Sequence, residues 1–171
     1  VAPDAVTVNT IVDACVSCGN ISQARLLLMN INVDKASLVL PKELIGTVAG
    51  VEAYTSLITG LAREGDMHGA FSILDVMMSR GVTANARTLG ALMNACMQSG
   101  RSGLQRAKEL LKFEDNKYLT GLTEAELTSL HGTYVVSLCT QSRNGVNTDP
   151  LGLLNDAKIA LSNMARNRIA P

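Results

Sequence analysis

The feature that most constrains this chain is a pair of short amphipathic stretches that recurs along it. Residues 53–82, "AYTSLITGLAREGDMHGAFSILDVMMSRGV", hold two such stretches joined by Glu-Gly-Asp. Similar pairs occupy residues 6–31 and 87–112. Gly65 and Gly100, which follow the first stretch of two successive copies, are 35 residues apart. A period near 35 with two amphipathic stretches per copy is typical of repeated helical hairpins.

Two further spacings support helical hairpins. In three copies an aliphatic residue precedes a glycine by eight residues: Ile11 and Gly19, Leu57 and Gly65, Leu92 and Gly100. Such a glycine ends a helix at no steric cost, because it accepts a left-handed backbone. In the second stretch an alanine is followed four residues later by a leucine: Ala24 and Leu28, Ala70 and Leu74, Ala107 and Leu111. This spacing puts both side chains on one helix face.

A single hairpin of this size cannot bury its own apolar face, but stacked hairpins can. The sequence therefore predicts an all-α fold, an α-solenoid of stacked helix-turn-helix repeats that form a right-handed superhelix. The expected divisions are a tail of a preceding repeat (1–4), a repeat with an insertion (5–50), a repeat (51–85), a second repeat with an insertion (86–127) and a divergent repeat (128–171). The insertions are expected at 32–50 and 112–126, and the chain is expected to be a fragment of a longer array.

Composition excludes several classes of protein. Hydrophobic residues make up 47% of the 171 residues, which is enough for a core. The 15 basic residues balance the 15 acidic ones, so net charge does not point to a polyanion. No apolar run approaches the roughly 20 residues that span a bilayer, and neither a targeting segment nor an initiator Met is present. We expect no membrane association.

The sequence offers little for catalysis or metal binding. Cys15 and Cys18 have the spacing of a redox or zinc pair, but no second pair exists and His68 and His131 stand alone. We expect all four cysteines, including Cys96 and Cys139, to be small core residues of helices. HExxH, a phosphate-binding glycine loop, a Ser/His/Asp set and a deaminase signature are all missing. The prediction is therefore no enzyme, no cofactor and no metal.

The hairpins resemble the pentatricopeptide repeat (PPR) family. "APDAVTVNTIVDAC", "AYTSLITGLAREGD" and "MMSRGVTAN" are similar to that family's consensus, with its Pro-Asp before a Val-Thr-Tyr-Asn-Thr-Leu-Ile type of opening and its Met before a Gly-Ile/Val ending. The tetratricopeptide repeat has a similar period, but its Trp and Leu-Gly signature is missing. The resemblance is specific in the first three copies and weaker in the fourth.

The resemblance implies binding of single-stranded RNA with one base per repeat. In that family the fifth and the last residue of a repeat select the base. For the second copy these are Thr55 and Asn85, a pairing that implies adenine. The first copy has Asn9, usual for pyrimidines, with Gly50 as its closing residue. The third and fourth copies have Gly90 and Gly132 in the fifth place.

The family's second-place residues would hold the base between successive repeats. They are Val6, Glu52, Arg87 and Ser129. Val6 suits an apolar clamp and Arg87 could stack on a base, whereas Glu52 puts a negative charge near the expected phosphate path. Near the end of a first helix only Arg63 is basic and could meet phosphate. The candidate RNA-binding residues are therefore Asn9, Thr55, Asn85, Val6, Arg63 and Arg87.

Two functions remain open. The first is sequence-selective binding of RNA by a PPR protein that acts in RNA processing, stability or translation in a mitochondrion or chloroplast. The second is a helical scaffold for other proteins of an organellar ribonucleoprotein assembly, such as a ribosome. The Thr55 and Asn85 pair favours the first. Neutral charge, insertions and two glycines in selecting places favour the second.

Overall fold

The computed structural model describes residues 4–30, 49–111, 119 and 122–143, together with the single positions 152, 155, 158, 159 and 162. Over these residues the regular structure is helical and contains no strand, which confirms the expected all-α class. The chain divides into two compact units, residues 1–83 and residues 84–171. Most of the insertion expected at 32–50 lies outside the described residues, as does most of the one at 112–126.

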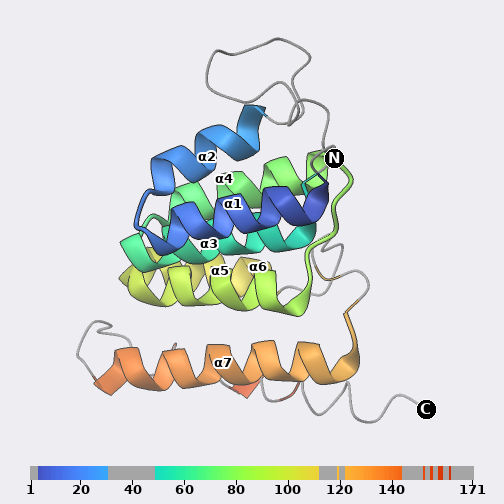
Figure 1. Cartoon of the computed structure of the whole chain (residues 1–171). Coiled ribbons are helices and arrows are strands. Elements are labelled where there is room, and N and C mark those ends of the chain that lie inside the picture. Colours follow the sequence, from blue (N-terminus) through green and yellow to red (C-terminus); the bar gives the residue numbers. More distant parts are fainter. Residues whose placement is uncertain are drawn as a thin grey trace. The chain divides into compact units, whose positions relative to one another are not determined.

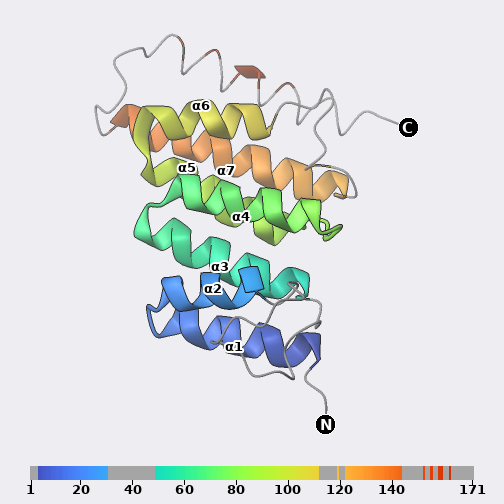
Figure 2. The same ribbon diagram turned by 90° about the horizontal axis from the view of Figure 1, so that it is seen from above.

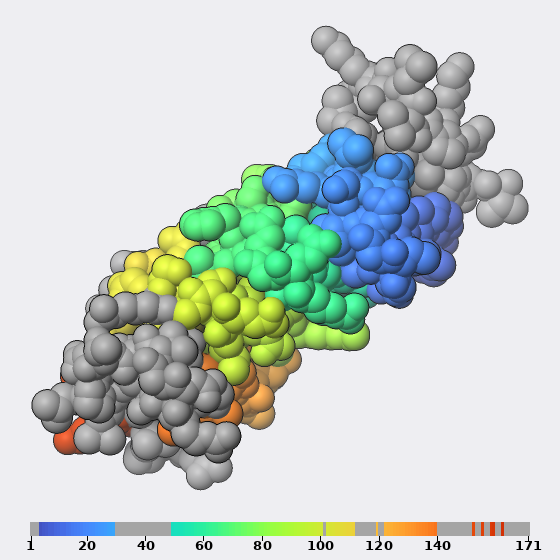
Figure 3. Space-filling model, turned by 90° about the vertical axis from the view of Figure 1, so that its left-hand side faces the viewer, coloured from blue at the N-terminus to red at the C-terminus, as the bar shows by residue number. Residues whose placement is uncertain are grey.

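The first unit consists of two helical hairpins. Helices α1 (Ala5–Ser17) and α2 (Ile21–Asn30) form the first, and α3 (Val51–Glu64) and α4 (Met67–Ser79) form the second. Helix α3 packs against both helices of the first hairpin as well as against α4. Figure 1 shows α1 and α3 side by side, and in Figure 3 the blue first hairpin lies directly against the green second one.

Local polar contacts determine where these helices begin. Asp4 caps α1 because its Oδ1 accepts a hydrogen bond of 2.9 Å from the Thr7 backbone N–H, and the Thr7 hydroxyl accepts one in return from the Asp4 N–H. Asp66 caps α4 through a bond of 2.8 Å from the Gly69 N–H. Each cap satisfies an N–H that has no partner inside its helix.

The turn glycines have the conformation that the sequence predicts. Gly65 ends α3 with φ at 76°, and its N–H and that of Asp66 donate to the carbonyls of Ala62 and Leu61. Gly19 has φ at 75° after α1. A residue with a Cβ would be strained in this left-handed conformation.

The core of the first unit contains the alanine and leucine pairs of the repeat. Ala24, Leu28, Ala70 and Leu74 are all fully buried, as is Leu57. The hairpins approach closely at Gly60, where a Cβ would come within 2.9 Å of Val16 Cγ1 and even closer to Ile21 Cδ1. The small residues thus allow close helix packing, which the sequence predicts for the alanines but not for Gly60.

The second unit consists of helices α5 (Ala86–Gln98), α6 (Gly100–Leu110) and α7 (Glu124–Arg143). Both α6 and α7 pack on α5, and they also contact one another (Figure 2). Ala107 and Leu111 are buried as expected. The closest approach, however, is at Gly103, where a Cβ would overlap the carbonyl oxygen of Cys96.

Helix α7 begins earlier than the sequence predicts. The expected boundary at residue 128 lies inside this helix, which begins at Glu124. Thr123 and Glu126 explain the early start, because the Glu126 carboxylate accepts from the Thr123 N–H at 2.8 Å and the Thr123 hydroxyl accepts from the Glu126 N–H at 3.3 Å. This reciprocal pair is a capping box. It also holds the pKa of Glu126 below its usual value.

The prediction that all four cysteines are core residues is wrong. Cys96 is buried on α5, but Cys15 is only half-buried, and Cys18 and Cys139 are exposed. Cys18 is exposed because it follows the last turn of α1, where the chain leaves the helix contacts. Cys139 is the residue after the buried Leu138 on α7, and one step along a helix turns a side chain away from the covered face.

Over the part of the chain that the structure describes, no helix is long and apolar enough for a membrane span.

Candidate nucleic-acid interface

Two hydrogen bonds fix how α1 and α3 pack. Asn9 Nδ2 donates to Glu52 Oε2 at 3.2 Å, and Ser56 Oγ donates to Asp13 Oδ1 at 2.9 Å. The partners of each bond are 43 residues apart, and the two bonds are one helical turn apart on both helices. Helices α1 and α3 are therefore parallel, with their N-terminal ends at the same edge.

This register brings the fifth residue of the first copy next to the second residue of the following copy. Asn9 is the fifth residue of the first copy, and Glu52 is the second residue of the next copy. The resemblance assigns base selection to the fifth place and base stacking to the second. Within the first unit the structure places these two side chains in contact, at the N-terminal end of the parallel pair.

Gly50, the last residue of the first copy, lies next to the Asn9 and Glu52 side chains. A Cβ built on Gly50 would come within 2.9 Å of Glu52 Oε2, 3.1 Å of Asn9 Nδ2 and 3.4 Å of Asn9 Oδ1. Asn9 Oδ1 is buried and has no hydrogen-bond partner among the described residues. The fifth, last and second places thus form one small cluster, which we call the Asn9 site (Asn9, Gly50 and Glu52). The spacing of the sequence motifs does not predict this contact.

The remaining candidates of the first unit have different surroundings. Val6 is 67% exposed on the first turn of α1, so its side chain is accessible as an apolar clamp. Arg63 is exposed in the last turn of α3, at the end opposite Glu52. Thr55 is only 5% exposed, and its hydroxyl donates to the carbonyl of Val51 at 2.8 Å. Thr55 is therefore a buried side chain of α3 with a hydrogen bond inside its own helix.

Asn85 has a structural role as the N-cap of α5. Its Oδ1 accepts hydrogen bonds of 2.9 Å from both the backbone N–H and the hydroxyl of Thr88. Asn85 and Arg87 are exposed and belong to the second unit, whereas Thr55 belongs to the first. The pairing of Thr55 with Asn85 therefore stays a prediction.

The fifth places of the third and fourth copies have open surroundings. A Cβ built on Gly90 or on Gly132 would meet nothing within 4 Å. These two places therefore carry no side chain that could hydrogen-bond to a base, although each has room for one.

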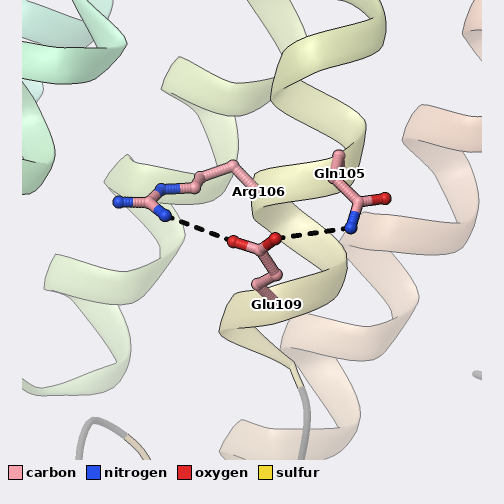
Figure 4. A network of polar contacts seen from close by, with 3 residues as sticks. All are labelled: Gln105, Arg106 and Glu109. Atoms are coloured by element: carbon pink, nitrogen blue, oxygen red, sulfur yellow. Dashed lines mark hydrogen bonds and ion pairs between the residues drawn. The ribbon is translucent and has the colours of Figure 1, made fainter.

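Two arginines of the described residues, Arg80 and Arg106, make contacts within the protein. Arg106 pairs with Glu109 at 3.2 Å on the exposed face of α6, and Gln105 Nε2 donates to the same carboxylate at 3.3 Å (Figure 4). Arg80 donates to the carbonyls of Leu28 and Met29. Both guanidinium groups are thus engaged in contacts within the protein. Within the described ranges no group of three or more His, Cys, Asp and Glu residues could hold a metal ion.

These observations define a repeat protein of stacked helical hairpins. In comparisons of the sequence with known proteins, the PPR repeat family matches residues 49–98 and the PPR repeat matches residues 6–31. No curated protein matches the sequence. Over residues 6–31 and 49–98 the chain matches the pentatricopeptide repeat family, as the hairpin motifs predict.

Proposed function

We propose that this chain binds single-stranded RNA selectively and acts in RNA processing, stability or translation in an organelle. PPR proteins generally bind RNA and are largely organellar. The observation that carries the proposal is the register of α1 and α3, which sets the fifth place of one copy against the second place of the next. A base can be both stacked and hydrogen-bonded only if its stacking residue and its selecting residue lie next to one another.

Within this proposal the second copy selects adenine through Thr55 and Asn85. A hydroxyl and a carboxamide are short groups that can hydrogen-bond to the Watson–Crick edge of a base. The cap on α5 occupies Asn85 Oδ1 but not the Nδ2 amino group. That amino group is the donor which we propose reaches the base.

The test compares RNAs that differ only at one adenine, measured by fluorescence anisotropy. Thr55→Val keeps the shape of the side chain and removes the hydroxyl. Asn85→Asp keeps the N-cap acceptor and removes the donor, so it separates base selection from helix capping. Each variant should lose the preference for adenine, by roughly 5- to 150-fold if the contact is worth about 1–3 kcal/mol.

The scaffold function is the second candidate. The two bare fifth places, Gly90 and Gly132, favour it, because two copies then lack a selecting side chain. If the parent chain binds none of the RNAs, or if both variants retain the parent's preference, the scaffold function replaces the proposal.

A further inference from the structure

We propose that Glu52 is a specificity-determining residue that closes the Asn9 site to RNA, so that the first copy reads no base. The inference rests on the proposed RNA-binding function. It begins with the bond of 3.2 Å from Asn9 Nδ2 to Glu52 Oε2, in which a neighbouring copy supplies the acceptor that a base would otherwise provide.

The carboxylate is a stronger competitor than a base. A carboxamide reads a base through its amino donor and its carbonyl acceptor. Hydrogen bonds to an ionised carboxylate are roughly twice as strong as those between neutral groups. A base carbonyl is a neutral acceptor and would have to displace Glu52. The other end of the side chain, Asn9 Oδ1, is buried and therefore gives a base no second contact.

Gly50 makes this closed arrangement possible. Any other residue would place its Cβ within 2.9 Å of Glu52 Oε2 and 3.1 Å of Asn9 Nδ2, tighter than ordinary contact. A larger closing residue would therefore push Glu52 away from Asn9. With glycine, the last place of the copy contributes no selecting group and leaves room for the carboxylate.

Helix α3 favours a negative charge at this position and RNA does not. Glu52 lies in the first turn of α3, at the positive end of the helix dipole, where an acidic side chain is stabilised. An incoming phosphate would meet that negative charge. The same carboxylate thus holds the Asn9 amino group and repels the RNA backbone.

The experiment uses the whole 171-residue chain and two probes, a short oligouridine and an oligoadenosine of equal length. Glu52→Ala removes both the acceptor and the charge, whereas Glu52→Gln removes only the charge. Glu64→Gln is the matched control, because Glu64 is an exposed glutamate at the other end of the same helix. Circular dichroism checks that all variants remain helical.

Glu52→Ala should bind oligouridine roughly tenfold more tightly than the parent, the change expected for one released hydrogen-bonding site. Its affinity for oligoadenosine should rise only by the part that comes from removing the negative charge, the same part that Glu52→Gln shows, and Glu64→Gln should match the parent on both probes. Glu52→Gln should gain less than Glu52→Ala. Adding Asn9→Ala to Glu52→Ala should remove the added preference for oligouridine over oligoadenosine, because that preference acts through Asn9.

Two failures are distinguishable. If the chain binds RNA but Glu52→Ala and Glu64→Gln bind oligouridine equally, the closed site is refuted while RNA binding stands. If the parent and every variant bind neither probe, both the closed site and the proposed function are refuted.

Discussion

At the scale of single residues, two candidate recognition side chains at helix starts are also held by contacts within the protein. Asn85 caps α5 with its oxygen, and Asn9 is held by Glu52. Replacing such a residue with alanine therefore removes a structural contact as well as any contact to RNA. Substitutions that keep one half of the side chain, such as Asn85→Asp, are needed to separate the two effects.

Cysteine reactivity provides a residue-scale prediction. Burial raises the pKa of Cys96 to about 12, although Arg106 partly opposes this rise. At pH 8 only about one Cys96 thiol in ten thousand is then ionised, and the thiolate is the reactive form. Iodoacetamide should modify the exposed Cys18 and Cys139 in the native protein and should modify Cys96 only after unfolding.

Peptide mass spectrometry after timed alkylation measures this difference, with a urea-unfolded sample as the control. The folded pKa lies above the usual thiol value, so the Cys96 contribution to stability is present below about pH 9 and is lost as the pH rises towards 12. Alkylation of native Cys96 as fast as Cys139 at pH 8 would contradict the buried position.

The sequence predicts some residues well and others poorly, for physical reasons. The turn glycines and the Ala24 and Leu28 pair follow from local spacing, which fixes a helix end or a helix face. The exposure of Cys139 depends on which part of that face a neighbouring helix covers. The contact between Asn9 and Glu52 depends on a register across 43 residues that include an insertion. Local patterns do not contain that register.

At the scale of helices, two glycines of the second unit should respond in opposite ways to alanine. Gly90 lies within α5 with open space around a Cβ, so Gly90→Ala should stabilise the unit by about 0.5–1 kcal/mol through helix propensity. Gly103 lies against the Cys96 carbonyl, so Gly103→Ala should destabilise it by about 1–3 kcal/mol through overpacking. Urea denaturation followed by circular dichroism measures both. Equal effects of the two substitutions would mean that α6 does not approach α5 at Gly103.

Arg80 links the helix ends of the first unit. Its guanidinium donates to the carbonyl of Leu28 at 2.8 Å and to that of Met29 at 3.0 Å, near the end of α2, and to the Tyr54 hydroxyl at 3.0 Å. Carbonyls at a helix C-terminus have no partner in their own helix and favour a positive charge.

Arg80→Ala should therefore lower the free energy of unfolding by about 1.5–3 kcal/mol, the range for hydrogen bonds to a charged group. Tyr54→Phe removes only one of the three bonds and should cost about 1 kcal/mol. Thermal denaturation compares the two variants. A larger loss for Tyr54→Phe than for Arg80→Ala would show that the tyrosine hydroxyl, and not the helix cap, is the stabilising contact.

Repeat spacing predicts where some helices begin but not others. The expected repeat starts at 5, 51 and 86 coincide with the first residues of α1, α3 and α5. The start of α7 at Glu124 was missed because the Thr123 and Glu126 box lies in a segment that resembles an insertion. A local capping signal thus took precedence over the repeat period.

At the scale of the whole molecule, balanced charge determines how RNA binding should depend on salt. The 15 basic and 15 acidic residues cancel, and Arg80 and Arg106 are engaged in contacts within the protein. Arg63, the candidate for a phosphate contact, and Arg87, the candidate for stacking on a base, are the two arginines of the proposed RNA-binding set, and both are exposed. Each phosphate neutralised on a single strand contributes about −0.7 to the slope of log K against log salt, so the total slope should be about −1 to −2.

Anisotropy titrations of one adenine-containing RNA at several salt concentrations measure that slope. Arg63→Gln should make it shallower by about 0.7, because one phosphate contact is lost. Glu64→Gln, the adjacent substitution on α3, serves as the control and should leave the slope unchanged. A slope of about −5 or steeper would require several more cations at the phosphates than Arg63 and Arg87 supply. The RNA path would then have to follow other basic residues of the chain.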